Sequence, residues 1–384
     1  MVRIVVIKSN LEKKLDVQLE KQKKSYLYRN TNSNHDMIDF CSNDYFGFAN
    51  SYKLNQKAKD ILSKYSYLNG STGSRLISGN NELIELAEQN ITSFFNGKAG
   101  LIFNSGYDAN IGFFSTIPNR NDTILYDELV HASIRDGIRM SYAKSYSFKH
   151  NDLNDLNSKI LKSKGEIFIV VESIYSMDGD EAPIVELNNI CIEKRCHLIV
   201  DEAHSTGFGY NNVFSLSEKY NIQPLARLHT FGKAMGCHGA IWIISKSLKK
   251  YLINFCRIFI YTTAPPPHSI AMMLASIDQL KEEYQLNQVI NKKIQLFKQT
   301  ASDINIESLL PSQSTIQSII ISGNKEVLTI AKSINNLGFN VKAIRYPTVP
   351  LGHERIRISL HTYNSDYEIK ELIKHIKNLQ YEKS

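Results

Sequence analysis

The sequence predicts an α/β protein built around a mostly parallel sheet, and three observations carry this prediction. Short apolar runs, typical of strands buried in a parallel sheet, recur at residues 101–103, 123–126, 167–171 and 198–200. The run from 101 to 103 follows a strongly amphipathic helical segment, as in α/β folds. The chain has 384 residues, which is more than one ordinary core holds, so we expect two domains.

Composition and charge are those of an ordinary globular enzyme. Apolar residues make up 42% of the chain and charged residues 22%. The net charge of +7 would suit an anionic substrate, although a generally basic surface is the simpler explanation. No basic patch interleaved with aromatic residues predicts nucleic-acid binding, and no apolar run predicts a signal peptide or a membrane span. Five cysteines without a Cys-x-x-Cys pair predict no disulfide framework and no metal site, so we expect a reducing, cytoplasmic location.

A lysine in a glycine-flanked turn is the centre of the predicted site. Lys233 ends the motif Thr-Phe-Gly-Lys and precedes the apolar run 240–244, with further glycines at Gly232, Gly236 and Gly239. Such a turn lets the backbone approach a flat ligand and leaves the amine accessible for a Schiff base. An ordinary surface lysine in a loop is the alternative interpretation of this motif taken alone.

An aspartate at the end of an apolar run supplies the second half of the pattern. Asp201 opens the motif Asp-Glu-Ala-His, directly after the run 198–200 and 32 residues before Lys233. The carboxyl ends of strands in open α/β sheets are where ligands bind. Pyridoxal phosphate needs a carboxylate on its pyridine nitrogen, because the protonated ring is the stronger electron sink. The two motifs together resemble the α-oxoamine synthase family of fold-type I pyridoxal-phosphate enzymes.

The resemblance covers the chain from about residue 39 to about residue 376. It implies pyridoxal 5'-phosphate as cofactor and an aspartate aminotransferase-like fold, with a mostly parallel seven-stranded sheet in a large domain and a small C-terminal α/β domain. We place an N-terminal arm at residues 1–50, the large cofactor-binding domain at 51–285 and the small domain at 286–384.

The N-terminal arm begins with a polar segment, residues 10–27, that we expect to be helical. Residues 37–40 are expected to form a short strand, after which Asn-Asp-Tyr-Phe-Gly-Phe resembles the family's Asn-Asp-Tyr-Leu-Gly-Leu. The resemblance places Asn43 near the carboxylate of the amino-acid substrate and includes Arg29 among the substrate-binding residues. Local turn chemistry is an alternative reason for Asn and Asp before a glycine.

A glycine- and serine-rich run at residues 70–79 precedes an amphipathic helix over 83–95, so we expect an ordered loop rather than a linker. The strand at 101–103 is followed by Ser-Gly-Tyr at the start of a second helix. Backbone amides at a helix start favour anions. The resemblance makes the backbone groups of Gly106 and Tyr107 ligands of the cofactor phosphate.

Two further strands lead to residues with roles implied by the resemblance. His131 follows the strand at 123–126; an ordinary loop histidine is the usual interpretation, whereas the resemblance implies stacking on the cofactor ring. The strand at 167–171 leads through Glu172 to Ser-Met-Asp-Gly-Asp, a close family match. Ser176 is the implied cofactor contact, and Glu172 an implied buried residue that holds the loop.

The remaining implied cofactor contacts lie on both sides of Lys233. By resemblance, His204 hydrogen-bonds the ring oxygen and Thr230 contacts the phosphate. Thr263 stands in Tyr-Thr-Thr-Ala-Pro-Pro-Pro, a motif that in the family serves the neighbouring subunit, which implies a homodimer with shared active sites. The loop at 207–214 is shorter than the family pattern, so its conformation is left open.

The C-terminal part is expected to alternate strands and helices. Alternation along a strand puts Arg355 and Arg357 on one face, which is either an exposed basic face or a site where Arg357 holds a substrate carboxylate with its two-pronged guanidinium. The resemblance places Thr348 near the product. We expect a long helical region at 268–303, strands at 314–321, 339–344 and 355–360, and helices at 325–336 and 365–379.

The resemblance implies a decarboxylative condensation of L-alanine with a pimeloyl thioester of CoA or acyl carrier protein, in biotin biosynthesis. Lys233 would carry the cofactor and act as base, Asp201 would hold the ring nitrogen, and His131 and His204 would contact the ring. The alternatives are a sister enzyme (2-amino-3-ketobutyrate CoA ligase, 5-aminolevulinate synthase or serine palmitoyltransferase) and a cofactor-dead binding protein. The acyl chain length and the acyl carrier are left open.

Overall fold

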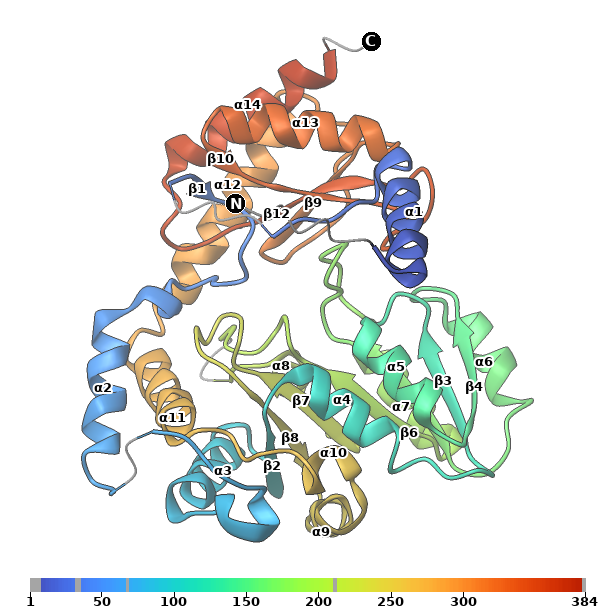
Figure 1. The fold of residues 1–384 in the computed structure, drawn as a ribbon, viewed down its shortest axis with the longest axis vertical. Helices are drawn as coiled ribbons and strands as arrows, with labels where there is room; N and C mark the ends of the chain where they lie inside the picture. The colour runs from blue at the N-terminus through green and yellow to red at the C-terminus, as the bar shows by residue number, and fades with distance from the viewer. Residues whose placement is uncertain (1–7, 32–35, 67–68, 210–212, 382–384) are drawn as a thin grey trace.

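A mostly parallel seven-stranded sheet forms the centre of the larger part of the molecule (Figure 1). The structure is a computed structural model that describes residues 8–31, 36–66, 69–209 and 213–381. The strand order is β2-β8-β7-β6-β5-β3-β4, in which β8 alone runs antiparallel to its neighbours. The predicted fold class is confirmed. The strands are β2 (Ala99–Phe103), β3 (Thr123–Asp127), β4 (Lys144–Phe148), β5 (Ile167–Glu172), β6 (His197–Asp201), β7 (Ala226–Thr230) and β8 (Ala240–Ile244).

Helices cover both faces of this sheet (Figure 1). Side-chain caps explain where several of them begin: Ser51 and Asn81, for example, each accept a backbone N–H from the first turn of the helix that follows. Across the described residues, no helix combines the length and the apolar composition needed to cross a membrane. The helices are α1 (Asn10–Lys24), α2 (Tyr52–Leu62), α3 (Glu82–Phe94), α4 (Gly106–Phe114), α5 (Ala132–Met140), α6 (Leu153–Ile160), α7 (Ile184–Lys194), α8 (Leu216–Lys219), α9 (Lys246–Phe255), α10 (Arg257–Ile260), α11 (Pro267–Glu282), α12 (Leu286–Asp303), α13 (Asn324–Asn336) and α14 (Asp366–Tyr381).

The apolar side chains of the sheet alternate between two cores, as the β pleat requires. Ile102 and Ile241 belong to a core shared with α2, α3 and α11. Leu101 and Trp242 belong to the opposite core, which they share with α4 and α9. Strands β5 and β6 are buried on both faces, and this explains why the sequence shows them as unbroken apolar runs.

A second, three-stranded antiparallel sheet in the order β11-β12-β9 lies beside the first, with α12, α13 and α14 around it (Figure 1). The short strand β1 (Ile38–Asp39) pairs in parallel with β10 (Phe339–Asn340), so the N-terminal part of the chain joins this C-terminal layer. Domain boundaries at residues 50 and 285 stay predictions. The strands of the antiparallel sheet are β9 (Ile316–Ile320), β11 (Lys342–Ile344) and β12 (Arg355–Ser359).

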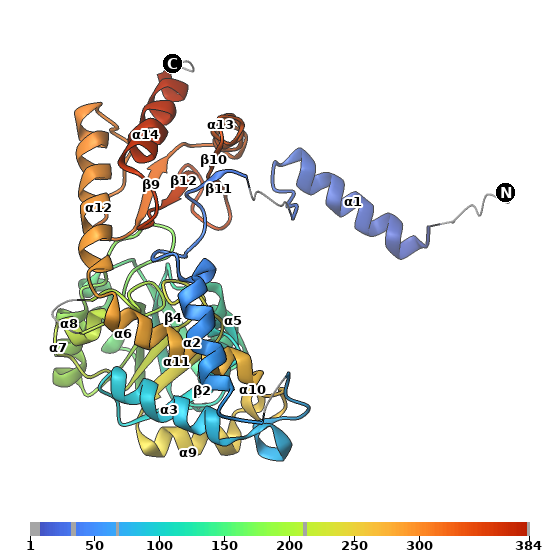
Figure 2. The same cartoon turned by 90° about the vertical axis from the view of Figure 1, so that its left-hand side faces the viewer.

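The helix predicted at residues 10–27 is present as α1, which projects away from the rest of the chain (Figure 2). It begins with a capping box at Ser9 and carries basic residues in its last turn, both of which stabilise a helix without tertiary contacts. None of its residues is buried. Local signals therefore account for this helix better than packing does.

Two predicted elements differ from the structure, and the structure has one additional strand. The single helical region expected at 268–303 is two helices, because the chain turns between the end of α11 at Glu282 and the start of α12 at Leu286 to carry α12 across to α14. The strand expected at 339–344 is divided at Val341, whose N–H is taken by the Asn335 side chain instead of a strand partner. Strand β4 was not predicted; it is polar and mostly exposed at the sheet edge.

His150 joins the end of β3 to the loop that follows β5. Its Nδ1 lies 3.0 Å from Asp127 and its Nε2 2.7 Å from Asp180. Its ring meets the buried Tyr175 ring edge to face, with centroids 4.4 Å apart. Burial alone would lower the pKa of His150, but the hydrogen bonds and negative charges of the two carboxylates outweigh it and raise this pKa to about 10.

We expect the variant His150→Gln to be less stable than the parent by about 2 to 4 kcal/mol near pH 6. The pKa of His150 is higher in the folded protein than in the unfolded chain, where it is near 6.5, so the charged histidine stabilises the folded protein fully below that pH. The stabilisation is lost as pH rises toward 10, so the gap between the two proteins should narrow over that range. Urea unfolding of both proteins at pH 6, 8 and 10 measures this difference in the free energy of unfolding. The control is His197→Gln, which breaks the more exposed 2.6 Å pair with Glu166 and should cost less than about 1 kcal/mol. A gap independent of pH would contradict the assigned charge state.

Candidate active site

A cavity of about 280 Å³ lies at the carboxyl ends of the strands, around Lys233. Its walls come from the ends of β5, β6 and β7 and from the starts of α4 and α5. This is the edge of an open α/β sheet where ligands are expected. The lining residues are Asn43, Ser105, Gly106, Tyr107, Asn110, His131, Ser133, Glu172, Asp201, Ala203, Thr230, Gly232, Lys233, His238 and Gly239.

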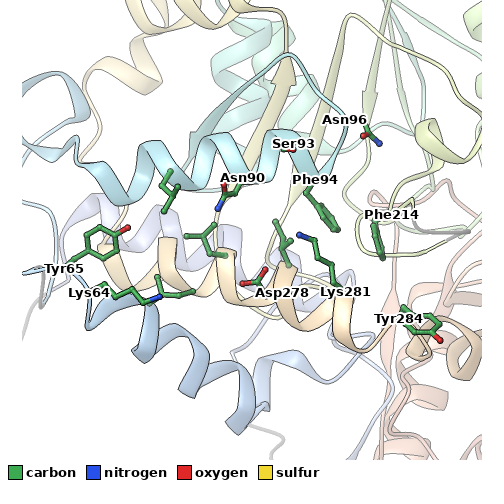
Figure 3. A pocket seen from close by; sticks show the side chains of 14 residues that line it. Lys64, Tyr65, Asn90, Ser93, Phe94, Asn96, Phe214, Asp278, Lys281 and Tyr284 are labelled. Atoms are coloured by element: carbon green, nitrogen blue, oxygen red, sulfur yellow. The ribbon is translucent and has the colours of Figure 1, made fainter.

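A larger cavity of about 730 Å³ lies elsewhere, among α2, α3 and α11 (Figure 3). Side chains of α3 and α11, among them Asn90, Asp278 and Lys281, face each other across it (Figure 3). These three residues are exposed, whereas the Lys233 cavity gathers buried titratable groups. Buried titratable groups in a cleft indicate chemistry, so we place the candidate active site at Lys233 despite its smaller volume.

The turn that carries Lys233 is shaped by glycines. Gly236 has a φ of +62° and contacts the backbone of Phe48 and Ala49 so closely that a Cβ there would lie within 2.5 Å of both. The turn is closed by hydrogen bonds from the Gly236 N–H to the Lys233 carbonyl and from the Cys237 N–H to the Phe231 carbonyl, both 2.8 Å. Any side chain at Gly236 would therefore displace the lysine.

The electrostatic setting of Lys233 makes its amine a base close to neutral pH. Burial lowers the pKa of Lys233 most; the carboxylates of Asp201 and Glu172 oppose this, and the positive charge of Arg357 adds to it. The resulting pKa is about 8 instead of the ordinary 10.5. Since imine formation and proton abstraction both need the neutral amine, this setting favours both.

Asp201 is the last residue of β6 and is held by two donors. Its Oδ2 accepts a hydrogen bond from Asn110 Nδ2 at 2.9 Å, and its Oδ1 accepts one from the Ala203 N–H at 3.0 Å. Asn110 also donates to Ser133 at 3.0 Å. The carboxylate is thus held by the Asn110 side chain of α4 and the Ala203 amide, and Ser133 of α5 holds Asn110 in turn.

Glu172 stands beside Asp201 at the end of the adjacent strand β5. Burial raises the pKa of Glu172 most, and the neighbouring negative charge of Asp201 raises it further, to about 8. Glu172 is therefore mostly a neutral acid at pH 7, able to donate a hydrogen bond, and one of its oxygens has no partner. The role predicted for it, holding the loop after β5, remains a prediction.

His131 caps the start of α5 and presents its ring to the cavity. Its Nδ1 lies 2.7 Å from the Ser133 hydroxyl and accepts the Ser133 N–H. Burial lowers the pKa of His131 most, and the charge of Lys233 also lowers it. A neutral, flat ring held in one orientation is suited to stacking on an aromatic ligand.

The start of α4 forms an anion-binding corner. Ser105 caps the helix by accepting the Asp108 N–H at 3.0 Å, which leaves the first amides, including those of Gly106 and Tyr107, without helical partners. A Cβ on Gly106 would come within 2.7 Å of Thr230, whose buried hydroxyl has no hydrogen-bond partner. The corner therefore offers two amides and a hydroxyl to a bound anion.

The site residues leave a set of unfilled polar atoms that fits pyridoxal phosphate. Buried oxygens of Asn110, Glu172 and Thr230 lack partners, and all three residues line the cavity. The Lys233 amine suits an aldehyde, and the Asp201 carboxylate suits a protonated ring nitrogen. The unsatisfied atoms are thus matched by the polar groups of this cofactor.

Arg357 is buried in β12 and reaches the same region. Its guanidinium donates to the Ser176 carbonyl at 2.6 Å, to the Ser359 hydroxyl at 3.0 Å and to Asn43 Oδ1 at 2.9 Å. The neighbouring Arg355 is also buried and pairs with Asp178 at 2.6 Å. The alternative of an exposed basic strand face is therefore wrong.

Six predicted site residues lie outside the lining of the cavity, among them His204 and Arg357, which contact Tyr45 and Asn43 respectively. Ser176 contributes its carbonyl to Arg357, and the Thr263 carbonyl accepts from Asn104 at 3.0 Å. Arg29 and Thr348 are both exposed. Of the loop at 207–214, residues 210–212 lie outside the described residues.

Sequence reasoning missed several residues of the site. Asn110 follows Gly106 by one helical turn, so the spacing of four could have placed it over the cavity. Tyr45 stands in the Asn-Asp-Tyr motif, but the contact of its hydroxyl with His204 Nδ1, at 2.9 Å, could not be predicted, because the two residues are 159 positions apart. Ser133 and His238 also line the cavity.

Known proteins are similar to nearly the whole chain. Residues 35–376 match the family model described as aminotransferase class I and II. A putative 8-amino-7-oxononanoate synthase from Bacillus licheniformis is 34% identical, covering 94% of this chain and 96% of the relative. The 8-amino-7-oxononanoate synthase of Emericella nidulans is 36% identical, covering 88% of each chain.

Two solved structures share the fold. An 8-amino-7-oxononanoate synthase from Francisella tularensis aligns with a TM-score of 0.78 at 28% identity, covering 91% of this chain and all of that one. A serine palmitoyltransferase from S. paucimobilis, solved with a PLP–myriocin aldimine, aligns with a TM-score of 0.87 at 22% identity, covering 98% and 99%. At that identity the second likeness shows the fold alone.

Proposed function

Because this chain belongs to the class I and II aminotransferase family, as a pyridoxal-phosphate-dependent acyltransferase of the α-oxoamine synthase type, we propose that it is an 8-amino-7-oxononanoate synthase. It would condense L-alanine with pimeloyl-CoA or a pimeloyl acyl carrier protein and release carbon dioxide and the thiol, in biotin biosynthesis. The observation that carries this proposal is the pair of the buried Arg357 with the half-buried Asn43, next to a lysine–aspartate cofactor site. The names of the relatives supply the substrates.

The cofactor is held by residues of three elements. Lys233 would bond its aldehyde carbon, and Asp201 would keep a proton on its ring nitrogen. The amides of Gly106 and Tyr107 and the hydroxyl of Thr230 would hold its phosphate, for which their free donors are suited. Pyridoxal phosphate, when bound, supplies an electron sink that stabilises negative charge at the α-carbon of the amino acid.

The chain's own residues then orient the amino acid and move its proton. Arg357 holds the carboxylate with two N–H groups, and Asn43 fixes the guanidinium. The Lys233 amine would be the base that takes the α-proton; its pKa of about 8 places it near working pH. His131, which lines the cavity, would cover the bound ligand and exclude water from it.

The proposal is tested by purified protein loaded with pyridoxal phosphate and assayed with pairs of amino acid and acyl-CoA. L-alanine with pimeloyl-CoA should release thiol at least about tenfold more efficiently than glycine or L-serine, since an α-methyl group in a fitted pocket is worth about 1 to 3 kcal/mol. Acetyl-, succinyl- and palmitoyl-CoA complete the matrix, and pimeloyl acyl carrier protein tests the carrier. Preference for glycine or serine would assign a sister enzyme, and cofactor binding without any thiol release would favour a binding protein.

We also propose a homodimer with shared active sites. Residues 73–79 and 259–264 lie side by side, joined by the hydrogen bond from the Ala264 N–H to the Gly73 carbonyl. Leu76, Ile77 and Tyr261 on these segments expose 51%, 86% and 72% of their surface, which is unusual for apolar side chains so close together. Sedimentation equilibrium should give twice the mass of the chain; a monomer at micromolar concentration would exclude this assembly.

A cytoplasmic location is proposed on the cysteines. All five are free, and three of them, Cys191, Cys196 and Cys256, are buried. Free cysteines are typical of a reducing compartment. Fractionation of cells that produce the protein should recover it with cytoplasmic markers, and recovery with the envelope would contradict the proposal.

A further inference from the structure

The hydroxyl of Tyr45 joins two parts of the site that are far apart in the sequence. It lies 2.9 Å from Nδ1 of His204 and 3.2 Å from Oδ1 of Asn43. Asn43 Oδ1 in turn accepts from Nη2 of Arg357 at 2.9 Å. Tyr45 is completely buried and His204 is 4% exposed, so water does not compete for these contacts.

The Tyr45 ring is held in place independently of its hydroxyl. Phe208 packs against it with ring centroids 5.5 Å apart, and the His361 ring stacks on it at 6.4 Å. The Tyr45 N–H donates to the Asn43 carbonyl, and the Thr362 N–H donates to the Tyr45 carbonyl, both at 2.9 Å. Loss of the hydroxyl should therefore leave the ring where it is.

His204 is neutral and carries a single ring proton. Burial lowers the pKa of His204 most, and the positive charges of Lys233, Arg357 and His131 lower it further, well below its ordinary value. No carboxylate is among the groups that act on this pKa. The position of the single proton is then decided by the partner of Nδ1.

The Tyr45 hydroxyl lies within 3.2 Å of two acceptors, His204 Nδ1 and Asn43 Oδ1, and the side chains of Thr315 and Arg357 also hydrogen-bond it. Asn43 Oδ1 already accepts a charged donor from Arg357, whereas Nδ1 of His204 is closer to the hydroxyl and has no other partner among the described residues. Tyr45 therefore donates to Nδ1, and the ring proton of His204 lies on Nε2. No hydrogen bond occupies Nε2 within the described part of the chain.

We infer that Tyr45 is a positioning residue: by donating to Nδ1 it keeps the proton of His204 on Nε2, where it is available to the ring oxygen of pyridoxal phosphate. The inference rests on the proposed function for the identity of that ligand. A donor at the ring oxygen favours the anionic form of that oxygen. A hydroxyl bonded to Nδ1 also polarises the imidazole, which makes Nε2–H a stronger donor.

The test uses the full chain loaded with pyridoxal phosphate, without any substrate. The near-visible absorbance of the bound cofactor is followed as a function of pH, and the measured quantity is the midpoint, the pH at which half of the absorbance change has occurred. Tyr45→Phe should raise this midpoint by about half to one pH unit, because the anionic ring oxygen loses part of its stabilisation. Incorporation of 3-fluorotyrosine at position 45 makes the hydroxyl a stronger donor and should move the midpoint downward. This second variant keeps the hydrogen bond, so it decides the question if Tyr45→Phe does not fold.

The matched control is Tyr363→Phe, which removes a hydroxyl bonded to Asp39 at 3.1 Å while its ring stays stacked on His361. This control should leave the midpoint unchanged. In a His204→Asn background, Tyr45→Phe should have no further effect. An unchanged midpoint in both Tyr45 variants, or the same shift without His204, would overturn the inference. A failure of the proposed function would be seen separately. Either the parent protein would show no cofactor absorbance, or no pair of substrates would release thiol.

Discussion

Replacing Lys233 by alanine is expected to lower thiol-releasing turnover by about 10⁴-fold or more, since in the proposed mechanism one amine both attaches the cofactor and moves the α-proton. The geometry supports two uses of a single amine. Lys233 lies in a cavity with Asp201 and Glu172, and its lowered pKa of about 8 leaves a useful neutral fraction near pH 7.5. Kinetics of thiol release at saturating substrate measure the loss.

Covalent attachment gives this prediction a second measurement. Borohydride reduction of the parent, followed by peptide mapping, should mark Lys233 and no other lysine. Lys246→Ala is the matched control, because Lys246 is exposed at the start of α9 and should keep full activity. A mark on another lysine, or an active Lys233→Ala protein, would remove Lys233 from the mechanism.

The same variant reports on the proposed shared site. Lys233→Ala chains mixed with chains altered at Thr263 form some dimers in which one site keeps both residues. Such mixtures should recover part of the parent activity, although neither variant is active alone. Absence of recovery in verified heterodimers would show that each site is built from one chain.

Replacing Arg357 by lysine is the second large change. Arginine at this position donates in three directions, to Ser176, Ser359 and Asn43, and lysine keeps the charge without this planar geometry. The α-hydrogen of the amino acid must stand perpendicular to the cofactor plane, so a misdirected carboxylate costs rate as well as affinity. We expect kcat/KM for L-alanine to fall about 30- to 1000-fold, the equivalent of about 2 to 4 kcal/mol.

A measurement of cofactor affinity distinguishes a loss of kcat/KM for L-alanine from a general defect of the protein. Arg357→Lys should bind pyridoxal phosphate almost as tightly as the parent, measured by equilibrium dialysis. Arg345→Lys is the control, because Arg345 is bonded to the Tyr26 and Tyr28 carbonyls of the N-terminal arm, away from the cavity. Equal use of alanine by the parent and Arg357→Lys would move the carboxylate site elsewhere, with the neighbouring buried Arg355 as the candidate.

The sequence was sufficient for the parts of the fold that local patterns encode. Strands β5 and β6 are unbroken apolar runs because both of their faces are buried. Strand β4 shows no such pattern, since it lies at the sheet edge and its residues 144–147 are exposed. The break between α11 and α12 was also invisible, because a turn at Glu283 carries no proline or glycine.

Contacts between distant segments were beyond sequence reasoning. Alternation in β12 put Arg355 and Arg357 on one face, but it could not say whether that face was exposed; the loop after β5 covers both. Nor could it show that Glu172 would stand beside Asp201 and hold a proton at neutral pH. Such features depend on which strands become neighbours, and hence on the whole topology.

The way in which the loop after β5 is attached also determines which substitutions in this loop leave the attachment intact. It is attached to the three-stranded sheet largely through main-chain acceptors: Arg357 binds the Ser176 carbonyl, and Ser318 binds the Met177 carbonyl at 2.7 Å. A carbonyl is present whatever the side chain, so substitutions at Ser176 or Met177 need not loosen the attachment. Retention of this junction therefore depends on the donors of β9 and β12 and on the Asp178 side chain that pairs with Arg355, more than on the side chains at 176 and 177.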